Sequence, residues 1–217
     1  LKAPLVRVRG QWVEVSGDDI RAAIATWKRK GPTKTTVGGL IRMALGAEPA
    51  SGQLDLDGVA GDGWVGELLE RLQGHRALST EPVPESFAGT LRPYQVRGYA
   101  WLAFLRDLGL GACLADDMGL GKTVQALALV LRDRARGEKR PVLLVCPTSV
   151  VGNWEREAAR FVPDLPVLVH HGVGRSRGPA FARAARKHAL VVSSYALLHR
   201  DMAHLGAIAW AGVILDE

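Results

Sequence analysis

The pattern of apolar and polar positions changes near residue 90. Before that point, residues 4–15 alternate apolar and polar side chains around Gly10, which predicts two short strands joined by a turn. Helical spacing of apolar residues then predicts three helices, over residues 16–30, 36–47 and 64–72. Residues 76–90 carry two prolines and no periodicity, and we interpret them as a linker. Residues 1–75 are therefore expected to form a small α+β region.

After residue 90, short apolar runs alternate with segments of helical periodicity. The apolar runs predict strands over residues 111–115, 142–146, 167–170, 190–193 and 212–215. The intervening segments predict helices over residues 94–108, 122–136, 151–161, 179–187 and near 195–205. Runs such as VLLVC and GVILD suit strands buried on both faces of a parallel sheet. Residues 91–217 are therefore predicted to form an α/β fold with a mostly parallel sheet and crossover helices.

Charge is distributed unevenly between the two regions. The chain of 217 residues has a formal net charge of +6. Residues 1–90 hold 11 Lys or Arg and 11 Asp or Glu, whereas residues 91–217 hold 17 and 11. The whole excess lies in the second region, where it favours an anionic partner. The neutral first region is the better candidate for protein contacts.

Composition excludes several classes of protein. A hydrophobic content of 47% argues against wholesale disorder, and the sequence has no apolar run long enough to span a membrane. Cys113 and Cys146 lie in apolar runs without a CxxC pair, so we expect two buried, reduced thiols. Because the chain starts at Leu1 and stops at Glu217 directly after an apolar run, we expect a piece of a longer protein.

A glycine-rich segment, DDMGLGKT at residues 116–123, follows a predicted strand and precedes a predicted helix. Its glycines let backbone N–H groups wrap phosphate oxygens, and the helix start adds a positive dipole end. Lys122 can reach the β- and γ-phosphates of a nucleotide, and Thr123 offers a hydroxyl to Mg²⁺. Asp116 replaces the first glycine of the strict phosphate-loop pattern. The nucleotide-binding residues predicted here are Asp117, Met118, Gly119, Leu120, Gly121, Lys122 and Thr123.

An acidic pair follows the last apolar run, at Asp216 and Glu217. A carboxylate at the C-terminal tip of a parallel strand beside a phosphate loop can hold Mg²⁺, directly or through water. A neighbouring Glu can orient or deprotonate the attacking water. We therefore predict Lys122, Asp216 and Glu217 as catalytic residues, and Thr123 and Asp216 as Mg²⁺ ligands. The alternative for the acidic pair is a solvated strand end.

Five motifs in order over residues 91–217 resemble the first RecA-like lobe of Swi/Snf-type ATPases of helicase superfamily two. They are LRPYQVRGYAWL, DDMGLGKT with VQALAL, VLLVCPTSVVGNWEREAARF, VVSSYALLHRD and VILDE. Residues 1–75 resemble the helicase-associated region of bacterial Swi/Snf-like proteins through PLVRVRGQWVEV and GWVGELLERL. The resemblance implies a DNA-dependent ATPase that uses ATP and Mg²⁺ to move on DNA, with duplex favoured. It also implies a second lobe, absent here, whose arginines complete the ATP site.

The resemblance assigns further site residues position by position. Gln95 would pair with the adenine edge, with Arg92 near the nucleotide; a capped helix start is the alternative for both. The residues assigned to nucleic-acid contacts are Pro147, Thr148, Ser149, Ser194 and Tyr195. Hydroxyls and free N–H groups at strand ends suit phosphate contacts, which position nucleic acid without reading its sequence. Trp154, in the next helix, suits either the core or a ligand.

Two clusters of basic residues accompany these motifs. The first comprises Arg132, Arg134, Arg136, Lys139 and Arg140, and such a run is often a solvated helix end. The second comprises Arg175, Arg177, Arg183, Arg186 and Lys187, which either line a groove or face solvent. A metal site at His170 and His171 is not favoured, because no Cys or carboxylate lies at ligand spacing.

Other functions stay open at this stage. A strand-separating or RNA-directed helicase would have the same fold and phosphate loop. A non-enzymatic docking module would use residues 1–75 to contact another protein. A small-molecule kinase is disfavoured, because the motifs after VLLVCPTS would have no purpose there. Since this chain holds one lobe, we expect it to bind nucleotide weakly and hydrolyse it poorly on its own. The resemblance also implies a cytoplasmic, nucleoid-associated bacterial protein.

Overall fold

The computed structural model describes residues 5–8, 11–14, 21, 39, 41, 63–72 and 81–216. The chain divides into two compact units, Leu1–Ala77 and Leu78–Glu217, and each is described by itself. Of the described helices, none is both long and apolar enough to cross a membrane.

The first unit contains a hairpin and a helix. Strand β1 (Leu5–Val8) pairs antiparallel with β2 (Gln11–Glu14), as the alternating pattern predicts. Helix α3 (Gly63–Leu72) buries Leu68, Leu69 and Leu72, which share one face at helical spacing. The predicted hairpin and third helix are confirmed. The predicted helices over residues 16–30 and 36–47 fall almost entirely outside the described residues.

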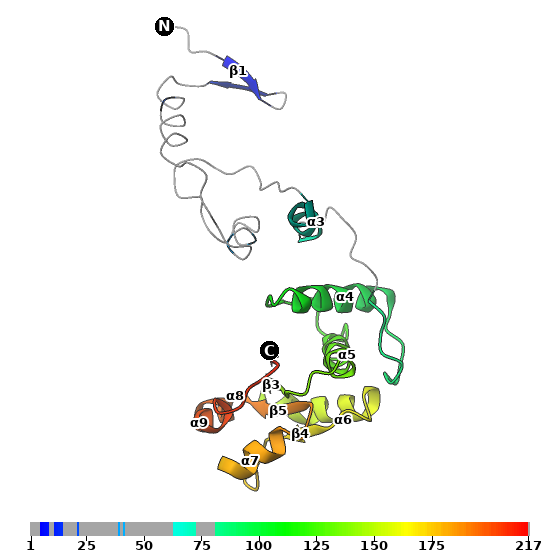
Figure 1. The fold of residues 1–217 in the computed structure, drawn as a ribbon, viewed down its shortest axis with the longest axis vertical. Helices are drawn as coiled ribbons and strands as arrows, with labels where there is room; N and C mark the ends of the chain where they lie inside the picture. Colours follow the sequence, from blue (N-terminus) through cyan, green and yellow to red (C-terminus); the bar gives the residue numbers. More distant parts are fainter. Residues whose placement is uncertain are drawn as a thin grey trace. The chain divides into compact units, whose positions relative to one another are not determined.

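The second unit is built on a parallel sheet of four strands in the order β4–β5–β3–β6 (Figure 1). Their bounds are Val142–Cys146 for β3, Val167–Val169 for β4, Leu190–Ser194 for β5 and Gly212–Leu215 for β6. In the central pair, Val142 lies opposite Leu190 and Cys146 opposite Ser194. Both central strands are buried throughout. The predicted α/β class and parallel sheet are confirmed.

Helices cover both faces of this sheet. Helices α4 (Pro93–Asp107), α5 (Lys122–Ala135) and α6 (Val151–Phe161) pack into one core, which Leu144 and Cys146 of β3 enter. Helix α7 (Gly178–Ala185) and α9 (Met202–Leu205) pack into a second core with Leu143 and Val145. Alternate residues of β3 therefore enter different cores, as strand geometry requires. Figure 1 shows α4 and α5 on one side of the sheet and α7 on the other.

The predicted strand over residues 111–115 is wrong, because this segment is irregular and pairs with no described strand. Cys113 within it is exposed, so the expectation of two buried thiols holds only for Cys146. Burial, with a smaller effect of the nearby Asp216 carboxylate, raises the pKa of Cys146 to about 11. A strand forms only where a neighbour satisfies its backbone groups, and the described sheet supplies none to this segment.

Two further differences from the predicted elements arise from long-range contacts. The helix expected near residues 195–205 is divided into α8 (Tyr195–Arg200) and α9, with Asp201 between them. Residues 81–90, within the predicted linker, belong to the second unit and pack against its core, where Phe87 is buried and its ring stacks 5.8 Å from that of Phe161. The Tyr99 hydroxyl donates to the main-chain oxygen of Pro82 over 3.1 Å. The domain boundaries themselves stay predictions.

Candidate functional site

Four segments meet at the carboxyl edge of the sheet, because all its strands run parallel. In strand order they are the loop after β4, the start of α8 after β5, the short helix Thr148–Val150 after β3, and Asp216 after β6. Ligands of open α/β sheets bind outside this edge. The topology therefore brings together the predicted nucleic-acid segments and the predicted catalytic carboxylate.

The phosphate loop opens α5, as predicted. Gly119 and Gly121 have φ angles of +83° and +78°, a conformation that side chains with a Cβ rarely adopt. The ammonium of Lys122 donates to the main-chain oxygens of Asp116 (2.6 Å) and Asp117 (3.4 Å). Met118 is 95% exposed. The loop is thus exposed to solvent at Met118. The Lys122 ammonium is hydrogen-bonded to the main chain of the same loop that would surround a bound phosphate.

Gln95 joins α4 to the phosphate loop. Its amide Nε2 donates to the Leu120 main-chain oxygen over 3.0 Å, and the Tyr94 hydroxyl donates to the same oxygen over 3.2 Å. Its Oε1 accepts from the Arg92 N–H over 2.9 Å, so Gln95 also caps the start of α4. Both interpretations weighed for Gln95 are compatible with this position. The assignment of Arg92 and Gln95 to the nucleotide stays a prediction.

A second glutamine, Gln125 of α5, is hydrogen-bonded to the loop, and the sequence did not predict this role. It is fully buried, and its Nε2 donates to Asp116 Oδ2 (3.2 Å) and to the main-chain oxygen of Gly121 (3.3 Å). A Cβ built on Gly98 of α4 would lie 2.0 Å from Gln125 Oε1. The signal in the sequence is a single amide within the apolar run VQALAL. A polar residue at a core position usually serves a specific contact.

Asp216 at the tip of β6 is fixed by three hydrogen bonds. Its N–H donates to the main-chain oxygen of Val145 over 2.9 Å. Its Oδ2 accepts from the indole Nε1 of Trp154 over 2.6 Å, and its main-chain oxygen accepts from the Tyr195 hydroxyl over 2.8 Å. Ile214, two residues earlier, packs against the same core as Val124 in the first turn of α5. The strand that carries Asp216 and the helix that follows the phosphate loop therefore pack against the same hydrophobic core.

The predicted metal ligands are compatible with a nucleotide-bound cation. Among the described residues, no three His, Cys, Asp or Glu side chains gather so that they could hold a metal on their own. Mg²⁺ needs no such cluster, since it commonly takes one or two protein oxygens and completes its shell with phosphates and water. Thr123 and Asp216, both partly exposed, supply such oxygens. Glu217 lies outside the described residues.

The residues assigned to nucleic acid differ in exposure. Thr148 and Ser149 are exposed, Pro147 is partly exposed, and Tyr195 is 42% exposed. Ser194 is buried, and its hydroxyl has no hydrogen-bond partner among the described residues. A ligand on the surface reaches the first four residues directly, whereas Ser194 would require a local opening. Trp154 is 4% exposed and belongs to the core while also contacting Asp216.

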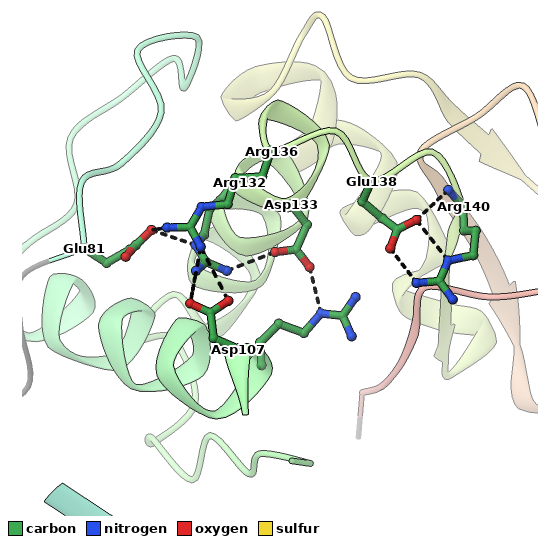
Figure 2. A network of polar contacts seen from close by, with 8 residues as sticks. Glu81, Asp107, Arg132, Asp133, Arg136, Glu138 and Arg140 are labelled. Carbon is green, nitrogen blue, oxygen red and sulfur yellow. Dashed lines mark hydrogen bonds and ion pairs between the residues drawn. The ribbon is translucent and has the colours of Figure 1, made fainter. Parts of the chain in front are cut away.

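Three of the five residues of the first basic cluster, Arg132, Arg136 and Arg140, are paired with acids (Figure 2). Arg132 is 3% exposed and pairs with Glu81, Asp107 and Asp133. Arg136 pairs with Glu81 and Asp107. Arg140 pairs with Glu138 over 2.6 Å, and this hydrogen-bonded guanidinium lowers the pKa of Glu138 to about 2. These residues lie at the end of α5 opposite the phosphate loop, where they join the chain entering the unit to α4 and α5.

In the second cluster, Arg175 is already paired. Its Nε donates to Asp201 Oδ2 over 2.6 Å, and His170 Nε2 lies 2.9 Å from the same oxygen. All three side chains are at most 8% exposed. The Arg175 hydrogen bond holds the pKa of Asp201 below its usual range, whereas burial lowers the pKa of His170. This trio ties the loop after β4 to the break between α8 and α9, and sequence spacing gave no signal for it.

Comparison with known protein families shows which family this fold and site belong to. Residues 94–217, more than half of the chain, match the family model of the SNF2-related domain. The chain belongs to the SNF2 family. Residues 1–45 match a second family, described as SNF2 helicase protein. The motifs quoted from the sequence therefore mark a Swi/Snf-type first lobe, and the resemblance is confirmed.

Individual relatives agree with this membership. A protein of Bacillus subtilis named as an ATP-dependent helicase/translocase, YwqA, is 38% identical over 98% of this chain, which spans 24% of that relative. The chromatin-remodeling ATPase INO80 of Drosophila melanogaster is 37% identical over 63% of the chain and 9% of its own length. A solved Sulfolobus solfataricus SWI2/SNF2 ATPase core in complex with dsDNA is 36% identical, with a TM-score of 0.55. That match covers 63% of this chain and 28% of the solved one. The chain thus spans less than a third of the length of each of these relatives.

Proposed function

We propose that the intact protein containing this chain is a DNA-dependent ATPase that moves on duplex DNA or remodels protein–DNA complexes. The observation that carries the proposal is the phosphate loop at residues 116–123, with two glycines at positive φ and Lys122 at the start of α5. Duplex DNA is favoured because the solved relative, similar in both fold and sequence, is a complex with dsDNA.

In this proposal the chain supplies half of a catalytic site. The loop backbone and Lys122 bind the nucleotide phosphates, and Gln95 orients the adenine. Thr123 and Asp216 would hold Mg²⁺, which would neutralise charge on the nucleotide phosphates. Glu217 activates the attacking water, and a second lobe supplies the arginines. Opening and closing of the two lobes then moves the DNA in steps.

The test uses the intact protein and the substitution Lys122→Ala. ATP turnover is measured alone and with duplex DNA, single-stranded DNA or RNA. We expect duplex DNA to stimulate the wild type most, and Lys122→Ala to lower the stimulated rate by about 100-fold, as loss of a transition-state donor does. The control is Lys139→Ala, an exposed lysine after α5. Equal turnover in Lys122→Ala and wild type would refute the proposal.

The alternatives make different predictions in the same assays. An RNA-directed motor would respond most strongly to RNA, and a strand-separating helicase would displace one strand of a partial duplex. A docking module would retain its cellular function in the Lys122→Ala variant. A cytoplasmic, nucleoid-associated location is part of the proposal and can be tested by imaging a fluorescent fusion.

A further inference from the structure

Two side chains donate hydrogen bonds to Asp216, one from the helix after the segment 147–149 and one from within the segment 194–195. One donor is the indole Nε1 of Trp154 in α6, which reaches Asp216 Oδ2 over 2.6 Å. The other is the hydroxyl of Tyr195 at the start of α8, which reaches the Asp216 main-chain oxygen over 2.8 Å. Because the strand order is β5–β3–β6, the Tyr195 side chain spans the end of β3 to reach the tip of β6. Asp216 is thus hydrogen-bonded to one residue from the segment after β3 and to one from the segment after β5.

Trp154 connects the turn after β3 to the Asp216 side chain. It is 4% exposed, and α6 follows directly after the exposed residues Thr148 and Ser149. A buried indole N–H requires an acceptor, and a carboxylate acceptor makes the hydrogen bond stronger than a neutral one. The bond engages Oδ2, whereas Oδ1 has no recorded hydrogen bond within the described part of the chain. A shift of α6 would therefore change the direction of the oxygen available to a metal.

Tyr195 connects the surface to the Asp216 backbone. Its ring is 42% exposed at the carboxyl edge, while its hydroxyl is used inside the molecule. An exposed aromatic ring whose polar tip is engaged can meet a sugar–phosphate backbone without losing its internal hydrogen bond. Contact with the ring can then be transmitted to the strand tip, since the acceptor is a main-chain atom between Leu215 and Glu217.

We propose that Trp154 and Tyr195 are positioning residues that couple nucleic-acid contact at the ends of β3 and β5 to the orientation of Asp216. Trp154 sets the direction of the carboxylate, and Tyr195 relays contact to its backbone. This inference rests on the proposed function. It adds that the response to DNA depends on two side-chain donors within the first lobe.

The test removes each donor. Tyr195→Phe deletes only the hydroxyl, whereas Trp154→Phe deletes the indole N–H together with part of a buried ring. In the intact protein, three quantities are measured: duplex affinity by fluorescence anisotropy, the Mg²⁺ concentration for half-maximal binding of a fluorescent ADP analogue, and the ratio of ATP turnover with and without saturating duplex. The ADP measurement reports on Asp216 independently of turnover.

The two substitutions have different expected effects. Trp154→Phe raises the Mg²⁺ concentration for half-maximal ADP binding by about 10-fold, as loss of a partner behind a metal ligand does. Tyr195→Phe lowers the turnover ratio at saturating duplex by about 5-fold, the effect of one hydrogen bond of ordinary strength. Saturation separates this loss from any change in duplex affinity.

Matched controls remove equivalent hydrogen bonds elsewhere in the lobe. Trp210→Phe deletes an indole N–H that donates to the Leu205 main-chain oxygen over 2.8 Å. Tyr99→Phe deletes the hydroxyl that donates to Pro82. The coupling is refuted if the two test variants match the wild type, or if the controls show the same losses. A wild type that duplex DNA does not stimulate refutes the proposed function as well, whereas a stimulated wild type with normal test variants refutes only the coupling.

Discussion

At the residue scale, two glutamine amides fix the phosphate loop to its surroundings, and two glycines make room for them. A Cβ on Gly121 would lie 2.5 Å from Gln95 Nε2, and a Cβ on Gly98 would lie 2.0 Å from Gln125 Oε1. Glycine in the middle of a helix lowers helix stability by about 1 kcal/mol relative to alanine. The close approach of the Gln125 amide explains why α4 has a glycine at position 98. While both amides keep their hydrogen bonds to the loop, neither glycine position has space for a methyl group.

Substitution of Gly98 tests this close approach. In Gly98→Ala, the new methyl group would displace the Gln125 amide from Asp116 and Gly121. We expect a loss of about 1–3 kcal/mol in the free energy of unfolding, the usual cost of overpacking, together with weaker nucleotide binding. Urea titration and binding of a fluorescent nucleotide measure the two effects.

The control for Gly98 is another helical glycine. A Cβ on Gly152 in α6 would meet only the tip of Arg156, at 3.8 Å. Gly152→Ala should leave nucleotide binding intact and preserve or raise stability, because alanine favours the helix. If Gly98→Ala behaves like Gly152→Ala, the Gln125 amide does not constrain the loop.

The buried histidine predicts a pH dependence of stability. Burial lowers the pKa of His170 in the folded state, while Asp201 opposes the shift. Below the ordinary His pKa of about 6.5, the unfolded chain therefore binds more protons than the folded one, and the free energy of unfolding falls as pH decreases. Urea titrations at pH 7.5 and 5.5 should show a smaller difference for His170→Asn than for the wild type. His199→Asn, an exposed control, should keep the wild-type difference.

At the element scale, local periodicity predicted most helices and strands, whereas contacts between distant residues decided the exceptions. Helix α3 buries a stripe that the sequence displays, and β3 and β5 are continuous apolar runs. The segment 111–115 is apolar too, but whether it forms a strand depends on a neighbouring strand, which its own residues do not specify. The break at Asp201 depends on Arg175 and His170, which lie 26 and 31 positions away. Similarly, the sequence located the loop and Asp216 but not the Gln125 and Trp154 side chains that support them.

The ion-paired network at the end of α5 holds several of these elements together. Arg132 joins α5 to Asp107 at the end of α4 and to Glu81 in the chain that enters the unit. In Arg132→Ala, its acidic partners lose a nearly buried cation, and we expect a loss of about 2–4 kcal/mol in the free energy of unfolding. In Arg140→Ala, a solvent-screened pair with Glu138 is lost, and we expect little change in the free energy of unfolding. Urea titration distinguishes the two, and equal losses would contradict a structural role for Arg132.

At the scale of the whole molecule, the net charge of +6 can be divided between basic side chains that are paired with acids and basic side chains that are not. Arg132, Arg136 and Arg140 are paired with acids, as is Arg175. Within the described part of the chain, exposed cations of the second cluster without a recorded ion pair are Arg177, Arg183, Arg186 and Lys187. The loop that carries Arg177 follows β4, so it leaves the same edge of the sheet as Thr148 and Tyr195. Among these four, Arg177 is therefore the cation that the strand order places at the edge where we propose that the phosphate backbone runs.

Salt dependence distinguishes the clusters. Each cation that contacts a DNA phosphate contributes about one unit to the slope of log affinity against log salt concentration. In the intact protein, Arg177→Gln should weaken duplex binding and make this slope shallower by about one unit. Arg136→Gln and Arg140→Gln should leave the slope unchanged, because their charge is already balanced by Glu81, Asp107 and Glu138. A slope that responds to the first cluster and not to the second would move the DNA path to the opposite end of α5, away from Asp216, and would also remove the physical basis for coupling through Tyr195.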